Sequence, residues 1–371
     1  MKSNKLIFLC LSLSGLLLTA CKPSAPVDNA KYYHAEYQNP LEVLTPDGKQ
    51  LQTEVADPSI VKGDDGLYYI FATDRMTLVS EDCCTWNQID YEIINWPTWQ
   101  NDLFPKTQFY MWAPDVIKVK DKWIYYYSLG SSEGKPGIGY GISDTCAGPY
   151  VDQGPLFTYE EIGDKDGTID PQVFYDADGS LHMVYGSFNG IFVLDLEDDG
   201  MALKEGEDGK GNKTIIAGYS AKSDFTTYEG AYMIYKDGYY YLFVSSNLSV
   251  EHENSLYAVY TGRSKSLEGP FVGEDKRPLT LSGNGNTYGS LVLHSKPSFR
   301  EFVAGPGHNS ILIDDKGDYW IYYHAYHKND NFKKRHLFMD KLTWDNQGFP
   351  LVKDQNPSFE ETLEGPALKE E

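Results

Sequence analysis

The chain has 371 residues, of which 41% are hydrophobic and 14% aromatic, and its formal net charge is -22. So acidic a protein repels phosphate backbones, which argues against nucleic acid as a partner and leaves a neutral polymer as a compatible one.

The first residues have the layout of a bacterial secretory signal. Lys2 and Lys5 precede an apolar run that is too short to cross a bilayer as a mature helix. The sequence Leu18-Thr19-Ala20-Cys21 resembles a lipobox. We therefore expect a signal peptide over 1–20, lipidation of Cys21 and a tether over 21–48, with the protein held at the outer membrane, periplasm or cell surface through its lipid anchor only. The alternative is an ordinary signal peptide with an incidental cysteine.

Three cysteines remain beyond Cys21, namely Cys83, Cys84 and Cys146. An odd number of cysteines with an adjacent pair is not a disulfide framework. A disulfide between Cys146 and either Cys83 or Cys84 stays open.

One pattern recurs five times along the chain. Each copy begins with a usually polar residue, places apolar residues three and four positions later, and reaches a turn at positions eight and nine. The five copies are Asp57-Pro58-Ser59-Ile60-Val61, Ala113-Pro114-Asp115-Val116-Ile117, Asp170-Pro171-Gln172-Val173-Phe174, Glu229-Gly230-Ala231-Tyr232-Met233 and His308-Asn309-Ser310-Ile311-Leu312. An aromatic-rich segment follows each turn, so the pattern predicts five hairpins.

The starts of the copies are 56, 57, 59 and 79 residues apart, a spacing that suits four-stranded blades. We therefore predict an all-β, five-bladed β-propeller over 49–352, followed by a C-terminal tail over 353–371. A β-sandwich would not explain one motif repeated five times.

The first position of the repeat is the candidate active centre. Inner strands of a propeller line its axis, so Asp57, Asp170, Glu229 and His308 are expected to face one another there. Gathered carboxylates cost free energy unless they share protons, bind a cation or serve catalysis. Glycoside hydrolysis needs two carboxyl groups, one to protonate the leaving oxygen and one to activate water or attack the sugar. The alternative is that each acidic residue only caps its own loop.

These motifs resemble family 43 glycoside hydrolases, which are five-bladed propellers that release arabinose, xylose or related sugars. The resemblance extends from about Tyr37 to Val352 and includes the segments around Asp57, Ala113, Asp170 and Glu229, although Ala231 replaces a usual proline. It implies that Asp57 is the general base, Glu229 the general acid and Asp170 the residue that raises the pKa of the acid and orients the substrate. It also implies inversion at the anomeric carbon, for which we expect the Asp57 and Glu229 carboxyls to lie about 6.5–9.5 Å apart.

Within that family the chain is most similar to the endo-arabinanase branch, through Gly186-Ser187-Phe188, Gly262-Arg263-Ser264 and Gly305-Pro306-Gly307-His308. The resemblance implies that His308 helps to hold a calcium ion with its water shell on the axis. The alternative is a neutral, hydrogen-bonded histidine in the channel. The branch's usual tryptophan after Gly-Ser-Phe is replaced by Asn189, and this difference weakens the case for endo action. The expected substrate-binding residues are Trp112, Asp115, Ile169, Ser187 and Phe188.

Two further interpretations stay open. One keeps the fold and changes the activity to an exo-acting arabinofuranosidase, a β-xylosidase or a galactan-cleaving enzyme. The second is a non-catalytic glycan-binding lipoprotein. In every case the expected partner is a polysaccharide or oligosaccharide, and the protein is expected to be a monomer.

Overall fold

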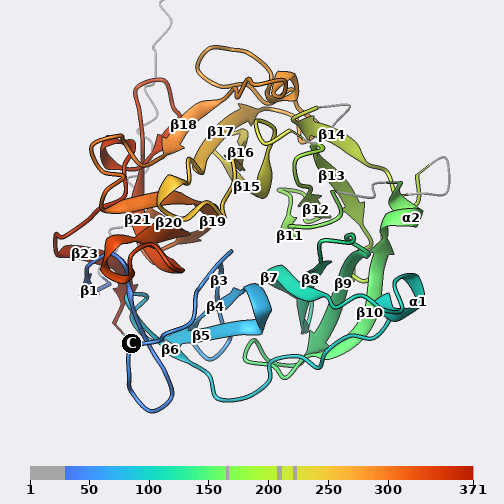
Figure 1. The fold of residues 1–371 in the computed structure, drawn as a ribbon, viewed down its shortest axis with the longest axis horizontal. Helices are drawn as coiled ribbons and strands as arrows, with labels where there is room; N and C mark the ends of the chain where they lie inside the picture. Colours follow the sequence, from blue (N-terminus) through green and yellow to red (C-terminus); the bar gives the residue numbers. More distant parts are fainter. Residues whose placement is uncertain (1–29, 164–166, 207–210, 220–223, 371) are drawn as a thin grey trace, which may run out of the picture.

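The computed structural model describes residues 30–163, 167–206, 211–219 and 224–370, and these form a five-bladed β-propeller (Figure 1). The predicted signal peptide and Cys21 lie outside the described residues. The inner strands β3 (Ser59–Lys62), β7 (Tyr110–Val119), β11 (Gln172–Tyr175), β15 (Glu229–Lys236) and β19 (Val303–Ile313) contact one another in sequence, and β19 contacts β3 to close the ring. The prediction of fold class is confirmed.

Each blade is an antiparallel sheet that begins with one of the predicted hairpins. The first blade continues with β4 (Tyr68–Ala72), β5 (Met76–Ser80) and β6 (Thr85–Gln88), and β2 (Glu42–Leu44) pairs parallel to β6. The second continues with β8 (Lys122–Gly130), β9 (Gly137–Ser143) and β10 (Val151–Thr158), and the third with β12 (Leu181–Tyr185), β13 (Ile191–Leu196) and β14 (Thr214–Ala217). The fourth continues with β16 (Tyr239–Ser246), β17 (Ala258–Ser264) and β18 (Ser290–Leu293), and the fifth with β20 (Tyr319–His327), β21 (Arg335–Trp344) and β22 (Pro350–Leu351).

Helices are short and lie in the connections between strands. They are α1 (Gln100–Leu103), α2 (Tyr159–Ile162), η1 (Thr73–Arg75), η2 (His252–Asn254), η3 (Leu279–Leu281), η4 (Lys328–Asp330) and η5 (Lys353–Gln355). In the part of the chain that the structure describes, none of them has the length and apolarity needed to cross a membrane.

The repeat starts share an unusual backbone conformation. The φ angle is positive, between 36° and 60°, at the first repeat position or, in the fourth copy, at the residue after it: Asp57, Ala113, Asp170, Gly230 and His308. This region is costly for residues other than glycine and persists only where neighbouring groups fix it. Side chains from the preceding blade provide that support, because they accept hydrogen bonds from the backbone amides of the four non-glycine residues. The pairs are Asp57 with His324 (3.1 Å), Ala113 with Thr73 (3.0 Å), Asp170 with Ser128 (2.9 Å) and His308 with Ser245 (2.9 Å).

Side chains at the third repeat position join neighbouring blades. Asp115 accepts a hydrogen bond from the amide of Val173 at 2.8 Å, Gln172 accepts one from Met233 at 3.0 Å, and Ser310 accepts one from Ile60 at 3.2 Å. Because the inner strands do not pair with one another, these bonds hold the strands in register around the axis.

The ends of the chain close the ring and extend the domain beyond the predicted limits of 49 and 352. Strand β1 (Tyr32–Tyr37) pairs antiparallel with β23 (Leu363–Lys369), and the Asn39 side chain bonds to both backbone groups of Met339 on β21. The residues assigned to a tether and a tail are therefore partly strands. They carry no turn or repeat signal in the sequence, because each strand's partner lies at the other end of the chain.

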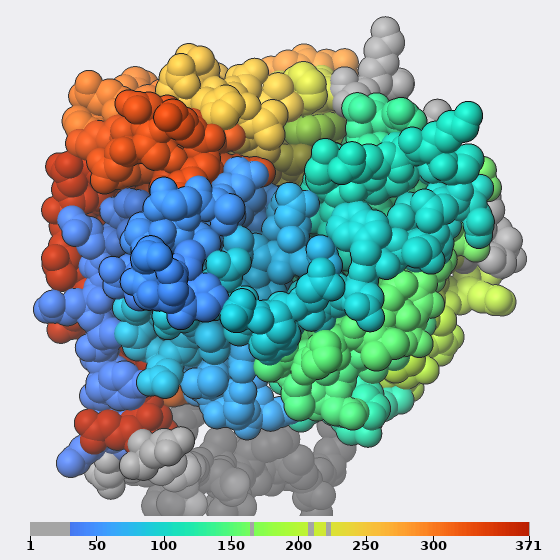
Figure 2. Space-filling model, turned by 60° about the horizontal axis from the view of Figure 1, so that its bottom comes forward, coloured from blue at the N-terminus to red at the C-terminus, as the bar shows by residue number. Residues whose placement is uncertain are grey.

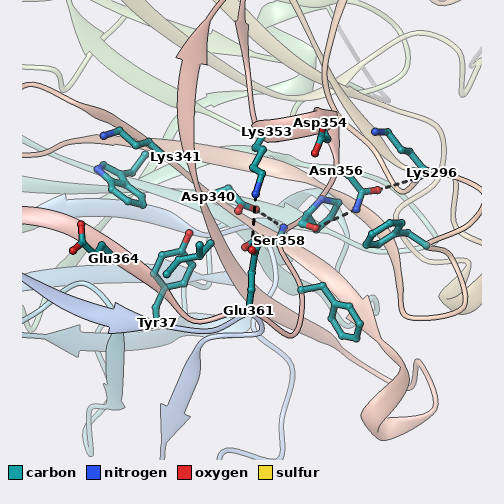
Figure 3. Close-up of a pocket in the computed structure, with 15 residues that line it drawn as sticks. Tyr37, Lys296, Asp340, Lys341, Lys353, Asp354, Asn356, Ser358, Glu361 and Glu364 are labelled. Atoms are coloured by element: carbon teal, nitrogen blue, oxygen red, sulfur yellow. Dashed lines mark hydrogen bonds and ion pairs between the residues drawn. The ribbon is translucent and has the colours of Figure 1, made fainter.

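A cavity of about 500 Å³ lies where this closure meets the fifth blade (Figure 3). Tyr37, Asp340, Lys353, Ser358 and Glu361 line it. Asp340 is buried and accepts hydrogen bonds from the Tyr323 hydroxyl at 2.6 Å and the Ser358 amide at 3.3 Å. The cavity holds none of the predicted site residues.

Apolar residues fill the spaces between adjacent blades, with Trp86, Tyr322 and Leu78 in the cluster between the fifth and first blades. Cys83, Cys84 and Cys146 are buried free thiols, so neither of the pairings left open by the sequence is present.

Candidate active site

The carboxylate of Asp57 lies near the axis, with 12% of its side chain exposed. The hydroxyl of Thr73 donates to one of its oxygens. Its second oxygen lies 3.2 Å from Nδ1 of His308, 3.2 Å from Nδ1 of His324 and 3.6 Å from the guanidinium of Arg335. The carboxylate is therefore held between groups of the first and fifth blades.

These neighbours keep Asp57 ionised. Burial would raise its pKa, but the positive charges of its neighbours outweigh burial and hold the pKa well below its usual value. His308 contributes charge only while it is protonated, whereas Arg335 stays charged. Burial also lowers the pKa of His308 to about 4, so this imidazole is neutral near pH 7. Arg335 then provides the positive charge beside Asp57. Its guanidinium is fixed by bonds of 2.8 and 3.1 Å to the two carboxylate oxygens of Glu54.

Asp170 and Glu229 form a pair of carboxyl groups at the axis, in addition to the carboxylate of Asp57. Oδ2 of Asp170 accepts a hydrogen bond from the amide of Gly230 at 3.1 Å, and Oε2 of Glu229 accepts one from the hydroxyl of Ser187 at 3.1 Å. The bond to Gly230 fixes the backbone directly after Glu229, so Asp170 controls the position of that side chain.

Burial gives this pair a proton at neutral pH. Burial, followed by the charges of Glu229 and Asp57, raises the pKa of Asp170 well above its usual value. Burial also raises the pKa of Glu229 to about 7, and the charge of Asp57 adds to the rise. Lys135 has the opposite effect on both groups. An ionised carboxylate and a proton-holding carboxyl pair thus share one axis, which is what acid and base catalysis of one bond requires.

The predicted substrate-binding residues differ in their exposure. Ser187 is buried against Glu229, and Ile169 is buried with its carbonyl bonded to the amide of Gly186 at 2.9 Å. Phe188 is half-buried and packs edge-on against Phe225, with ring centroids 5.2 Å apart. Trp112 is half-buried and lies against Gly130, where an added Cβ would come within 2.1 Å of the indole. Of these four residues, Phe188 and Trp112 therefore have exposed ring surface.

Asp115 differs from its expected role. Its side chain is buried, and both carboxylate oxygens bond to protein groups, the hydroxyl of Ser59 and the amide of Val173, each at 2.8 Å. Burial raises its pKa to about 6. The strict alternation of strand side chains is broken just before Asp115, because β7 has a register shift between Trp112 and Asp115. We interpret Asp115 as a link between three blades.

The expected calcium site at His308 has few protein donors. Calcium prefers six to eight oxygen ligands, and among the described residues no group of three or more His, Cys, Asp or Glu side chains could hold a metal ion. Nδ1 of His308 faces the Asp57 carboxylate, and the Arg335 cation lies beside the same oxygen. These residues do not fit a calcium ion bound directly by protein side chains, and no catalytic step is assigned to one.

Sequence reasoning missed several residues of the site. A polar residue follows each repeat start by 15 to 17 positions, and together these form a set that we call the support ring: Thr73, Ser128, Ser187, Ser245 and His324. Ser187 was expected to bind substrate, and the other four were not predicted as site residues. This second periodicity was readable in the sequence. Tyr257 was also missed. It is buried beside Glu229, and the backbone of Gly307 packs so closely that an added Cβ would come within 2.2 Å of the Tyr257 ring.

A propeller whose axis gathers an ionised carboxylate and a carboxyl pair that holds a proton has the acid and base groups that glycoside hydrolases use as a class. Comparison with known proteins gives the particular family. The family model for glycosyl hydrolases family 43 matches residues 50–350, and the chain belongs to this family.

Individual relatives agree with the family match. The chain is 28% identical over 317 residues to the extracellular exo-alpha-(1->5)-L-arabinofuranosidase ArbA of Cellvibrio japonicus, covering 82% of this chain and 88% of that protein. It is 30% identical over 322 residues to the extracellular endo-alpha-(1->5)-L-arabinanase of Thermotoga petrophila, covering 73% of this chain and 64% of that protein. The structure of Cellvibrio cellulosa alpha-L-arabinanase complexed with arabinohexaose superposes with a TM-score of 0.71 at 27% identity, covering 82% of this chain and 96% of that one.

Proposed function

We propose that this enzyme hydrolyses the α-L-arabinofuranosidic linkages of arabinan or arabinose-containing polysaccharides with inversion. The observation that carries the proposal is the convergence of Asp57, Asp170 and Glu229 on one axis, with Asp57 ionised and the two remaining carboxyls retaining a proton. The names of the relatives support arabinan as the substrate.

The proposed mechanism divides the work between the two carboxyl sites. Asp57 takes a proton from water as the water attacks the anomeric carbon. Glu229 donates its proton to the leaving oxygen. Asp170 positions Glu229 through the Gly230 amide and, as a close carboxyl neighbour, favours retention of the proton. A separation of about 6.5–9.5 Å between the Asp57 and Glu229 carboxyls stays a prediction of the inverting mechanism.

The test is hydrolysis of linear arabinan, branched arabinan and an aryl α-L-arabinofuranoside by the purified protein. Release of β-arabinose, detected by proton NMR before mutarotation, would support inversion. Asp57→Asn and Glu229→Gln should reduce turnover by at least about 10²-fold while the fold persists by circular dichroism. An intact wild-type protein that hydrolyses no pentose-containing glycan would favour a non-catalytic glycan-binding protein.

The products of hydrolysis distinguish endo cleavage from exo cleavage. Early oligosaccharide ladders from linear arabinan would indicate endo action, whereas a single small product would indicate exo action. The two named relatives include one of each kind. Activity on aryl β-xylosides would indicate a β-xylosidase, and activity on galactan would indicate a galactan-cleaving enzyme.

We also propose secretion as a monomer with a lipid anchor at Cys21. Three relatives are named as extracellular enzymes, which supports secretion. Cys21→Ser should release the protein from the membrane fraction, whereas an ordinary signal peptide would leave its distribution unchanged. Light scattering on the purified domain measures its molar mass and so tests whether the protein is a monomer.

For calcium, we propose the ion with its water shell that the resemblance implies. An ion that keeps most of its water shell would need only His308 as a protein ligand, and the acidic axis favours a cation. Calcium titration of the chelated protein, followed by thermal unfolding, tests this proposal.

A further inference from the structure

A second pocket is lined in part by Asp74 and Arg75, which directly follow Thr73, the residue that donates a hydrogen bond to Asp57. It has a volume of about 540 Å³ and is lined by Asp74, Arg75, Trp96, Pro97, Thr98, Gln100, Asn101, Thr107, Gln108, Phe109 and Tyr110. Most of these residues belong to the connection between the first and second blades. In Figure 2 this connection, coloured cyan to teal, lies on the surface beside the blue first blade.

The pocket combines two exposed aromatic rings with a buried amide. Trp96 is 40% exposed and Tyr110 45% exposed. Gln100 is only 4% exposed, donates from Nε2 to the carbonyl of Pro97 at 3.0 Å, and has no hydrogen-bond partner for its buried Oε1 among the described residues. A buried acceptor without a partner costs free energy, and a ligand hydroxyl can satisfy it once the side chain turns its oxygen toward the pocket.

The charges of the pocket favour a neutral ligand. The guanidinium of Arg75 lies over the Trp96 ring at 5.3 Å and 3.4 Å from the carboxylate of Glu92. The carboxylate of Asp74 also borders the pocket, so the positive charge of Arg75 is already balanced. Flat apolar ring faces next to polar groups suit a sugar, which presents apolar ring faces and hydroxyl groups together.

Two connections join the pocket to the catalytic centre. Thr73, the residue before Asp74, donates to Asp57 and accepts from the amide of Ala113. Tyr110 precedes Trp112 by two positions on β7 without a register shift between them, so both side chains lie on one face of the strand. Because strands rise ~3.3 Å per residue, Tyr110 lies roughly 7 Å further along the strand than Trp112.

Backbone strain marks the same place. Asp74 and Arg75 are consecutive non-glycine residues with positive φ, 59° and 62°. This conformation aims Arg75 at Trp96 and at the carbonyl of Ile94, to which it donates at 3.2 Å.

We propose that this pocket is a distal carbohydrate subsite, in which Trp96, Tyr110 and Gln100 bind a pentose unit of the polysaccharide outside the cleaved linkage. The inference rests on the proposed function and extends it, because the pocket selects for long or branched substrates over small glycosides.

The experiment compares linear and branched arabinan with an aryl α-L-arabinofuranoside for Trp96→Ala, Tyr110→Ala and Gln100→Leu. We expect kcat/KM on at least one polymer to fall at least tenfold, mainly through KM, while kcat/KM on the aryl substrate changes less than threefold. Trp96→Phe keeps an aromatic face and should retain most of the polymer activity, which separates stacking from a folding defect. Tyr235→Ala is the matched control, because Tyr235 is 47% exposed on β15 and lies outside the pocket.

Binding is measured separately in the Glu229→Gln background by affinity electrophoresis in gels that contain each arabinan. Loss of retardation on adding Trp96→Ala or Tyr110→Ala would support the subsite even if the catalytic proposal failed. Equal polymer-to-aryl ratios in all variants and unchanged retardation would overturn it. A wild type that is retarded by arabinan but inactive on every substrate would overturn the proposed function alone.

Discussion

The amide of Gly230 donates a hydrogen bond of 3.1 Å to Oδ2 of Asp170, so the residue that follows Glu229 is fixed by the carboxyl group of the neighbouring blade. Asp170 is itself fixed by the preceding blade, because the hydroxyl oxygen of Ser128 accepts a hydrogen bond from the backbone amide of Asp170. The position of the proposed acid thus depends on a chain of contacts across three blades.

Replacement of Asp170 by asparagine should alter the pH profile as well as the rate. The pKa of Glu229 is raised to about 7, so kcat/KM of the wild type should fall as the pH rises above about 7. Loss of the neighbouring carboxyl favours ionisation of Glu229 and should move this alkaline limb to lower pH, with kcat reduced about 10²-fold. Kinetics on an aryl arabinofuranoside from pH 4 to 9 provide the measurement. An alkaline limb that does not move would show that Asp170 acts only on position.

Arg335 should control the acid limb of the same profile. Its guanidinium lies 3.6 Å from Asp57 and is the cation beside this carboxylate once His308 is neutral. Arg335→Met should raise the pKa of Asp57, move the acid limb to higher pH and reduce kcat/KM about 10- to 100-fold. Arg335→Lys should move the limb less because it keeps the charge.

The double variant Glu54→Gln with Arg335→Met is the control for this experiment, because it removes the Glu54 charge that the single variant leaves without its partner. Its acid limb should also lie at higher pH than that of the wild type. An acid limb unchanged in both variants would contradict the role of Arg335.

The sequence predicted the blades and the three acidic residues because both follow from one local repeat. Each copy places its first residue at the axis, so Asp57, Asp170 and Glu229 could be brought together without long-range information. The support ring carries a second periodicity that is also readable, since Thr73, Ser128 and Ser245 occupy comparable places after their own repeat starts.

Arg335 and the closing strands could not be found in this way. Arg335 lies in the last blade, but its partner Glu54 precedes the first blade. Tyr32–Tyr37 and Leu363–Lys369 have no repeat partner in the sequence, and they pair only because ring closure brings the ends of the chain together. The contacts of Asp115 with Ser59 and Val173 could not be predicted either, since a register shift in β7 breaks the strict alternation of strand side chains.

Asp115→Ala should destabilise the fold rather than weaken substrate binding. It removes the acceptor for Ser59 and Val173, two buried donors, at a cost of about 2–4 kcal/mol in the free energy of unfolding. Asp115→Asn can accept from Val173 and donate to Ser59, so it should recover most of that loss. Urea denaturation and KM should be measured for both variants. A large rise in KM with normal stability for Asp115→Asn would restore a substrate-binding role.

Calcium should raise the thermal stability of the chelated protein if a hydrated ion binds at His308. The expected result is a saturable increase in Tm of a few degrees with calcium, since a ligand that binds only the folded state stabilises it. His308→Ala should abolish this increase, whereas Ser310→Ala, two residues further along β19, should retain it. No increase at millimolar calcium would show that His308 does not hold a calcium ion.

Asp340 should make the stability of the ring closure depend on pH. Burial raises its pKa from 3.8 to about 6, so the folded protein holds a proton that the unfolded chain has lost between these two values. The free energy of unfolding should therefore fall as the pH rises from about 4 to about 6, and the penalty should persist above that range. Asp340→Asn keeps an oxygen that can accept from Tyr323 and Ser358 but carries no charge. It should be more stable than the wild type by about 1–3 kcal/mol at pH 8 and close to it at pH 4. Chemical denaturation at the two pH values tests this difference, and an equal effect of the substitution at both would show that folding does not raise the pKa of Asp340.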